Sequence, residues 1–255
     1  YMGALISGRG AFQIIIPNNI TQIRPYAFAI LPPGTDPNAF YYENLTIPSN
    51  ITHIYEYAFY YTNITGTLTI PATVQEIYHR AFYYCNINEC VIASLTPNAT
   101  DIFQGCSNLR KITVAEPVTT LYKSNFGYTR NISELVLPAT LTSMETGTFS
   151  QASPPSVIRF LGETPPVITT KVFSDIPGAA LLVPANAYYT YYNATNYTTL
   201  RSYIFGFQYF NAGDVLPDTL SGMPVKWFRD YIDAYYGSNN LTTSPSNREL
   251  IALFV

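Results

Sequence analysis

The sequence contains a short unit that recurs almost unchanged along the chain. Residues 44–59 read NLTIPSNITHIYEYAF, and residues 67–82 read TLTIPATVQEIYHRAF, which is the same pattern 23 positions later. A unit of this length cannot bury its apolar face alone, whereas stacked copies cover one another. The repeat therefore predicts a stacked array of similar units rather than a conventional globular domain.

The proline that follows each strand-like L-T-I segment sets the phase of the repeat. Degenerate residues at the expected spacing fill the three anchor positions that lack a proline. The resulting anchor positions are Pro17, Pro48, Pro71, Ser94, Ala115, Pro138, Leu161 and Pro184. The longer interval after Pro17 contains the turn-rich segment LPPGTDPN, residues 31–38, which we expect to form an outward loop.

Several residue columns keep this phase. Apolar residues stand one and three places before each anchor, so their side chains point to the same face of a strand. A proline at the anchor cannot donate a hydrogen bond to the sheet, and it ends that strand. Phenylalanines about eleven places after the anchors predict a stack of rings in the core, formed by Phe28, Phe59, Phe82, Phe103, Phe126, Phe149 and Phe173.

The pattern L-x-I-P-x-x-[VI]-x-x-I-x-x-x-A-F, with GCSNL at Gly105–Leu109, resembles the BspA-type leucine-rich repeat of bacterial surface proteins. The resemblance covers roughly residues 11–203, and residues 181–200 resemble the closing repeat of that family. It implies a β-rich, right-handed leucine-rich repeat solenoid with a parallel sheet of short strands, in about eight repeats of about 23 residues. It also implies an exported, cell-surface protein that mediates adhesion or protein interaction rather than catalysis.

The repeat stops near residue 203, so we expect a leucine-rich repeat region over residues 1–203 and a small helical region over residues 204–255. Residues 224–237 read as a helix, with Pro224 near its start and Gly237 at its end. Ser246 and Glu249 have the spacing of a capping box and predict a second helix. These helices would cap the repeats or begin another module.

Composition excludes several functional classes. Only 11% of the residues are charged and the formal net charge is −3, with no basic run of the kind that binds nucleic acid. No apolar stretch approaches the roughly 18 residues of a membrane-spanning helix. Low charge with abundant tyrosine favours a secreted or cell-surface protein. Because the chain starts at Tyr1 without a leader, we expect a processed chain whose signal peptide is absent.

Nothing in the sequence predicts catalysis, a cofactor or a metal site. The two histidines, His53 and His79, fall in different columns and lack the spacing of metal ligands. Asp230 and Asp233 are the closest carboxylates in the tail, and we expect them to solvate one helix face rather than work as an acid–base pair.

Two of the three cysteines, Cys85 and Cys106, share one column of adjacent repeats. Strands about 4.8 Å apart would bring their Cα atoms within the range that a disulfide allows. In the family that the chain resembles, this column holds small, buried, free cysteines, and the resemblance therefore implies unbonded thiols. With the anchor positions given above, no other cysteine occupies the same repeat column as Cys90.

The strand face opposite the core is the first candidate binding surface. It carries the residue two places before each anchor, and this column is β-branched and nearly uncharged. Such a face favours contact with a protein or a glycan over a charged ligand. The candidate residues are Thr46, Thr69, Ile92, Thr113, Val136 and Arg159.

Tyrosine columns are the second candidate surface. Each adjoins a buried column, so the rings should lie at or near the surface and stack about 5 Å apart, either to bind a ligand or to shield the backbone. They comprise Tyr55, Tyr78 and Tyr122, then Tyr60 and Tyr83, then Tyr61, Tyr84 and Tyr128.

The hypothesis with most support is binding of another macromolecule through the sheet face and the tyrosine columns. The expected partner is a protein, either of a host matrix or of another bacterial surface. A glycan-binding module with tyrosine platforms is one alternative. A repeat spacer of a larger multidomain surface protein is the other.

Overall fold

The structure is a computed structural model that describes residues 11–12, 14–30, 41–153, 155–169, 172 and 178–255. The predicted loop at residues 31–38 and Phe173 lie outside the described residues.

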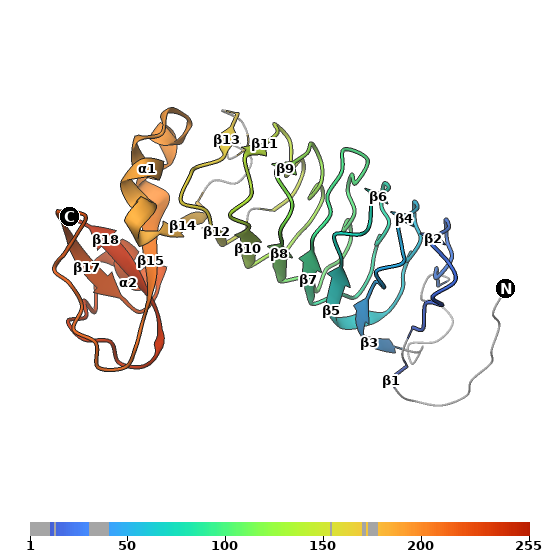
Figure 1. The fold of residues 1–255 in the computed structure, drawn as a ribbon, viewed down its shortest axis with the longest axis horizontal. Coiled ribbons are helices and arrows are strands. Elements are labelled where there is room, and N and C mark those ends of the chain that lie inside the picture. Colours follow the sequence, from blue (N-terminus) through green and yellow to red (C-terminus); the bar gives the residue numbers. More distant parts are fainter. Residues whose placement is uncertain (1–10, 13, 31–40, 154, 170–171, 173–177) are drawn as a thin grey trace.

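One large sheet runs the length of the molecule (Figure 1). Its 12 strands follow the order β1-β3-β5-β7-β8-β10-β12-β14-β15-β18-β17-β16. Each neighbouring pair from β1 to β15 is parallel, and the pairs from β15 onward are antiparallel. The strands are β1 (Ala11–Phe12), β3 (Tyr41–Thr46), β5 (Ile64–Ile70), β7 (Glu89–Ile92), β8 (Lys111–Val114), β10 (Glu134–Leu137), β12 (Val157–Phe160), β14 (Ala180–Pro184), β15 (Ile204–Phe210), β16 (Thr219–Leu220), β17 (Met223–Phe228) and β18 (Arg248–Phe254).

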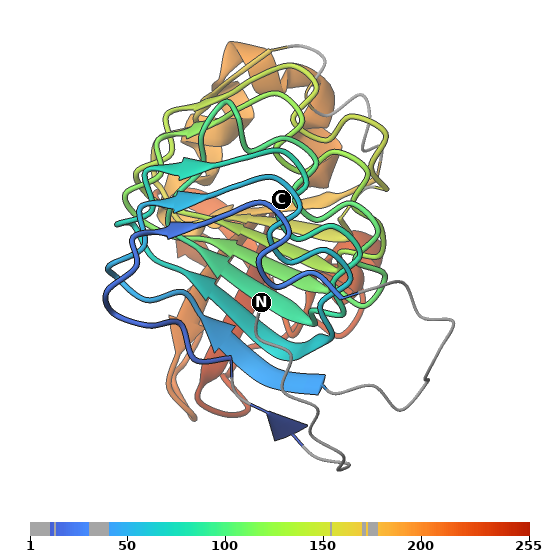
Figure 2. The same cartoon turned by 90° about the vertical axis from the view of Figure 1, so that its right-hand side faces the viewer.

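Two small parallel sheets lie on the opposite side of the molecule, as the end-on view in Figure 2 shows. One contains β2 (Gln22–Ile23), β4 (His53–Ile54) and β6 (Glu76–Ile77), and the other contains β9 (Thr120–Leu121), β11 (Ser143–Met144) and β13 (Val167–Ile168). We call the segment from one strand of the large sheet to the next a coil. The β-rich array with a parallel sheet of short strands that the sequence predicts is confirmed.

A phenylalanine stack fills the space between the large and small sheets. Phe59 is fully buried, and its ring is parallel to that of Phe28 at 5.0 Å and to that of Phe82 at 4.8 Å between centroids. The stack continues from Phe82 to Phe103 at 6.0 Å. The predicted column of stacked core rings is therefore confirmed for these coils.

The phase predicted for the fourth coil is wrong by one residue. Ile92 pairs with Ile70 on one side and with Val114 on the other, and it is fully buried. The anchor is thus Ala93 rather than Ser94. Cys90 consequently lies in register with Leu68 and Ile112, and it is a buried member of the core column rather than an isolated cysteine.

The predicted column of Cys85 and Cys106 is confirmed, and all three cysteines are free and buried. Each of the two thiols donates a hydrogen bond to the carbonyl of a core phenylalanine one coil earlier, Cys85 to Phe59 at 2.9 Å and Cys106 to Phe82 at 3.1 Å. Burial raises the pKa of Cys85 and of Cys90 well above the usual range of a thiol. Both groups are therefore protonated and inaccessible at neutral pH.

We predict that Ellman's reagent will not react with the native protein at neutral pH and will titrate all three thiols once the chain is unfolded in denaturant. Rapid reaction of the folded protein would show that the cysteine columns open to solvent.

A helical segment closes the last parallel coil. It contains η1 (Ala185–Ala187), α1 (Tyr188–Asn193) and η2 (Thr195–Tyr203). The hydroxyl of Tyr191 donates to the carbonyl of Gly162 at 2.9 Å, and that of Tyr197 donates to the carbonyl of Pro166 at 3.2 Å. Burial raises the pKa of both tyrosines, so they stay neutral donors that anchor this segment to the coil before it.

Residues 204–255 differ from the prediction of two helices. Residues 223–228 form β17, and only the second half of the predicted helix exists, as α2 (Tyr231–Tyr236). Asp230 caps α2 by accepting a hydrogen bond from the backbone nitrogen of Asp233, and Gly237 ends it at a φ of 66°. The second predicted helix is wrong, because Arg248–Phe254 is strand β18, which pairs with both β15 and β17.

The C-terminal strands bury side chains on both faces. Trp227 packs on one face with Phe210 and Leu250, while Phe228 packs on the other with Leu182 and Ala234 of α2. Helix α2 therefore covers the outward face of the large sheet at its C-terminal end.

Candidate functional site

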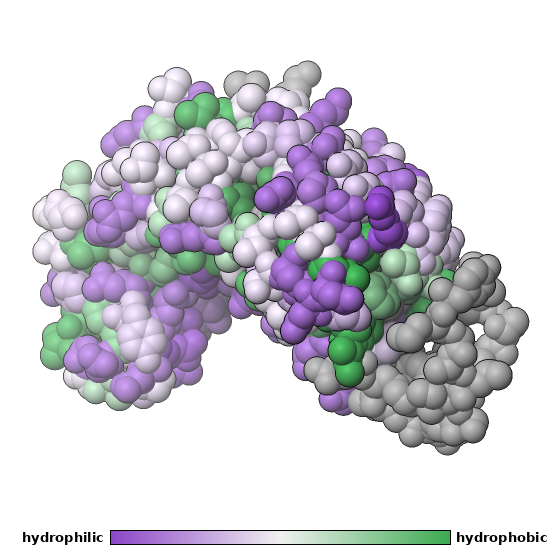
Figure 3. Space-filling view, turned by 45° about the vertical axis from the view of Figure 1, so that its right-hand side comes forward, coloured by the Kyte–Doolittle hydropathy of each residue, from purple (hydrophilic) through white to green (hydrophobic). Residues whose placement is uncertain are grey.

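The outward face of the large sheet lines the underside of the molecule. Figure 1 places the strands of this sheet along the lower side, and Figure 3 shows an arched shape whose underside is hollowed beside the C-terminal region. Thr46 is exposed on this face, and Thr69 and Thr113 are half-buried. These three side chains occupy the outward positions that the sequence predicts.

Three members of the predicted sheet-face column need separate comment. Ile92 faces the core, and it was assigned to the outward face only because the predicted phase was wrong by one residue. The outward residue of β7 is Val91, which pairs with Thr69 and Thr113. Val136 lies in the outward register but is only 8% exposed. Arg159 is also in the predicted register, and its side chain is 18% exposed.

A charged row beside this column was missed by the sequence analysis. It lies two residues earlier on each strand, and residues of alternate position share a face, so the same period predicts it. Glu89, Lys111 and Glu134 are paired across β7, β8 and β10. Lys111 forms an ion pair with Glu134 at 2.9 Å. The outward face is therefore uncharged along one row from β3 to β10 and charged along the next row from β7 to β10.

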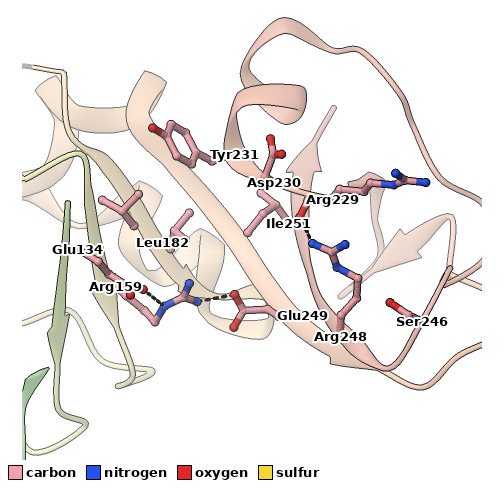
Figure 4. A pocket seen from close by; sticks show the side chains of 11 residues that line it. Glu134, Arg159, Leu182, Arg229, Asp230, Tyr231, Ser246, Arg248, Glu249 and Ile251 are labelled. Atoms are coloured by element: carbon pink, nitrogen blue, oxygen red, sulfur yellow. Dashed lines mark hydrogen bonds and ion pairs between the residues drawn. The ribbon is translucent and has the colours of Figure 1, made fainter. Parts of the chain in front are cut away.

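The charged row ends in a cavity between the repeats and the C-terminal strands (Figure 4). The cavity has a volume of about 400 Å³. Arg159 bridges its two sides, with one nitrogen 3.1 Å from Glu134 and another 2.6 Å from Glu249 of β18. Arg248 also lines the cavity and donates to the carbonyl of Arg229 at 3.2 Å. Among the described residues, neither Arg248 nor Arg229 forms an ion pair, so both guanidinium groups can receive an acidic group.

Glu134 is the centre of this ion-pair chain. Burial acts to raise its pKa, but the hydrogen bonds from Lys111 and Arg159 outweigh this effect, and the pKa lies below the usual value of 4.5. The ionised carboxylate therefore stabilises the folded state above about pH 4.5, and this stabilisation is lost as the pH falls through the lower folded pKa.

We expect Glu134→Gln to reduce the free energy of unfolding at neutral pH by about 1 kcal/mol, because the side chains are partly exposed and solvent screens the pairs. The difference between the variant and the unaltered protein should disappear in urea melts at acidic pH. Glu89→Gln is the matched control, since Glu89 is exposed in the same row. An equal loss for Glu89→Gln, or a Glu134→Gln loss that persists in acid, would contradict the assignment.

Tyrosine rings form ladders on the coils, as predicted. Tyr55 stacks on Tyr78 at 4.9 Å, Tyr60 on Tyr83 at 5.6 Å and Tyr61 on Tyr84 at 4.8 Å. The rings of the second and third ladders meet edge to face, Tyr60 against Tyr61 at 4.7 Å and Tyr83 against Tyr84 at 4.6 Å.

Tyr122 does not extend the first ladder, because its coil is two steps from that of Tyr78. The described residues contain no ring pair between them. The sequence did not indicate a further member, Tyr57, whose ring stacks on Tyr26 at 5.3 Å and meets Tyr60 and Tyr83 edge to face. The result is a connected aromatic surface that spans three coils.

Two histidines of the tyrosine-bearing coils pair with neighbouring hydroxyls. His53 lies 2.9 Å from the Thr52 hydroxyl, and His79 lies 2.8 Å from the Thr100 hydroxyl. In the part of the chain that the structure describes, no three His, Cys, Asp or Glu side chains are grouped so that they could hold a metal ion. No helix among the described residues has the length and apolar character needed to cross a membrane.

Comparison with known proteins identifies the repeat. Residues 36–154 match, in six copies, the family model described as a BspA type leucine rich repeat region. The predicted resemblance is thus confirmed over these residues. No curated protein matches the chain.

One similar solved structure is the crystal structure of the pneumococcal vaccine antigen PcpA. The match has 20% sequence identity and a TM-score of 0.49, and it covers 61% of this chain and 42% of that chain. This chain therefore matches less than half of the length of that antigen.

Proposed function

We propose that this chain, whose residues 36–154 carry BspA-type leucine-rich repeats, is an exported, non-catalytic surface protein that binds another protein through the outward face of its large sheet. The parallel register from β1 to β15 and the recurring core columns favour a right-handed solenoid of about eight repeats. Low charge and high tyrosine content favour an extracellular location.

The observation that carries the proposal is the uncharged row on this face. Thr46, Thr69, Val91 and Thr113 follow one another across four adjacent parallel strands. β-Branched side chains have few rotamers, so little conformational entropy is lost when a partner covers them. A rigid, slightly concave row of this kind suits the extended surface by which repeat proteins bind other proteins.

The charged cavity at the end of the row adds a second requirement on the partner. Among the described residues, Arg248 and Arg229 line the cavity without carboxylate partners, whereas Arg159 is already held by two glutamates. A partner that is neutral over the threonine row and carries an acidic side chain near Arg248 would complement this face.

The test compares two double variants in pull-downs from host matrix proteins and bacterial surface extracts. Thr69→Arg with Thr113→Arg places two long charges on the row and should abolish capture of the partner. Thr73→Arg with Ala139→Arg places the same charges on exposed turns and should leave capture unchanged. Equal capture by both double variants would rule out the sheet face as the binding surface.

A second candidate function is glycan binding by the tyrosine ladders. The parallel rings at 4.8–5.6 Å spacing support it, because aromatic faces offer large contact areas with polar hydroxyls at their tips. If neither surface binds a ligand, the remaining possibility is a repeat spacer of a larger surface protein.

A further inference from the structure

One tyrosine ladder is interrupted by a glycine. The backbone nitrogen of Tyr61 bonds to the carbonyl of Tyr83, that of Tyr84 to Gln104 and that of Tyr128 to Ser150, so each coil repeats the same position. Tyr61, Tyr84 and Tyr128 occupy this position with φ of 54° to 56°, and Gly105 occupies it between the last two with φ of 80°. The ladder thus lacks one ring.

The missing ring leaves an open site rather than a filled one. Tyr84 lies directly against Gly105, because a Cβ atom at that glycine would be 2.8 Å from three atoms of its ring. Beyond Gly105, a cavity of about 340 Å³ extends to the ring of Tyr128. Both rings are solvent-accessible, with Tyr84 44% and Tyr128 38% exposed.

The slot is bounded by aromatic rings. The rings of Tyr84 and Tyr128 both line the cavity, and the ring of Tyr84 also lies over Gly105. Aromatic faces of this kind can pack against the C–H groups of a sugar ring.

The polar groups of the slot distinguish a hydroxylated ring from a flat aromatic ring. The Oε1 atom of Gln104 is buried and lacks a hydrogen-bond partner among the described residues. Ser107, Arg130 and Asn131 line the same cavity. Asn131 already donates to the carbonyl of Ser107 at 3.1 Å. A hydroxylated ring offers a donor to Gln104 and acceptors to Arg130, which a purely aromatic guest lacks.

We propose that the slot between Tyr84 and Tyr128, floored by Gly105, binds one pyranose ring of a carbohydrate, with its C–H faces against the two tyrosines. This inference rests on the glycan-binding candidate above and gives it a location and a ligand class. It is independent of the sheet-face proposal, because no residue of the slot belongs to a strand of the large sheet.

The first wall of the slot is held in place before a ligand arrives. Tyr84 is fixed on one face by Tyr61 at an interplanar angle of 7° and at its edge by Tyr83 at 90°. Tyr83 is in turn covered by the guanidinium of Arg80, 5.1 Å from its centroid. A fixed ring loses little entropy on binding, which favours weak but specific capture of a single sugar ring.

The test uses saturation-transfer NMR with a panel of neutral and acidic methyl pyranosides, together with a glycan array. The protein is made in a bacterial host, so that the N-x-S sequon at Asn131 carries no sugar of its own. The unaltered protein should saturate the ring protons of at least one pyranoside. Tyr128→Ala should weaken that binding by at least about tenfold, equivalent to 1.4 kcal/mol.

Gly105→Tyr should also abolish binding, because its side chain displaces the ring of Tyr84 and fills the slot. Tyr26→Ala is the matched control, since Tyr26 is an exposed ring that stacks on Tyr57 and does not line the slot, and it should retain binding. Circular dichroism melts verify the folding of each variant, and Tyr128→Ala still decides the question if Gly105→Tyr fails to fold.

Three results would overturn the inference. They are absence of pyranoside binding by the unaltered protein, binding that survives Tyr128→Ala, and preferential binding of a flat aromatic probe such as p-cresol. Sugar binding that survives Tyr128→Ala but is lost on Tyr55→Ala would reject the slot while retaining glycan binding by another ladder. None of these results bears on capture of a protein by the sheet face.

Discussion

Replacing Phe59 with alanine is expected to lower the free energy of unfolding by about 3–5 kcal/mol. The ring is fully buried and contacts another phenylalanine on each face, at 5.0 and 4.8 Å. Its removal leaves a cavity that the neighbouring coils cannot close without moving their backbones. Urea unfolding followed by circular dichroism at constant m-value measures the loss.

Tyr26→Ala is the control for this experiment. Tyr26 also stacks on a ring of the next coil, at 5.3 Å, but it is 56% exposed. Its loss should cost no more than about 1.5 kcal/mol, the range of an aromatic pair without deep burial. Similar losses for both variants would mean that ring stacking, rather than burial of the core column, determines the stability.

Trp227→Ala is expected to have a comparable effect, confined to the C-terminal strands. Trp227 is 1% exposed, meets Phe210 edge to face at 4.7 Å and donates its indole N–H to the carbonyl of Pro217 at 2.9 Å. The substitution should cost about 3–5 kcal/mol. In a repeat protein, each unit contacts only its neighbours, so the loss should decay towards the first coils.

Hydrogen exchange measured by mass spectrometry tests this localisation. Protection should fall in β17 and β18 and stay unchanged in β5 and β7. Trp227→Phe should retain most of the protection, since it loses mainly the indole hydrogen bond, worth about 1 kcal/mol. A uniform loss across the chain would show that the C-terminal strands and the repeats unfold as one cooperative unit.

The repeat architecture was readable from the sequence because every coil repeats the same physical constraint. Leu45 and Leu68 occupy the same repeat position and face inward, and Phe59 and Phe82 stack at a second shared repeat position. The single error in phase arose at Ala93, where no proline marks the end of the strand. A shift of one residue reverses the face of every side chain in a strand, and Ile92 was therefore assigned to the wrong side.

The C-terminal strands were not predictable, because their pairing is not local. Ser246 and Glu249 have the spacing of a capping box, but Glu249 pairs with Arg159, 90 positions away, instead of capping a helix. Val225 and Trp227 belong to one apolar cluster and Phe228 to another on the opposite face of the sheet, and this arrangement exists only once β15 and β18 are in place. Only the second half of the helix predicted over residues 224–237 exists, as α2, and its end at Gly237 was predictable because that signal is local.

In the candidate site, too, some features follow from the period of the repeat and others depend on the non-local pairing of the C-terminal strands. The threonine row and the tyrosine ladders follow from the period of the repeat, and so does the charged row of Lys111 and Glu134, which only needed a second outward column. The cavity at Arg159 requires Arg248 and Glu249 from a strand whose position the period does not specify.

The most direct test of the proposed function is site-specific photo-crosslinking from the sheet face. A photoreactive phenylalanine analogue at Thr113, in the outward row of β8, should form a crosslink to the captured partner protein. The same analogue at Thr73, on the exposed turn after β5, should not. Crosslinking from Thr73 but not from Thr113 would contradict the proposal that the outward face of the large sheet is the binding surface.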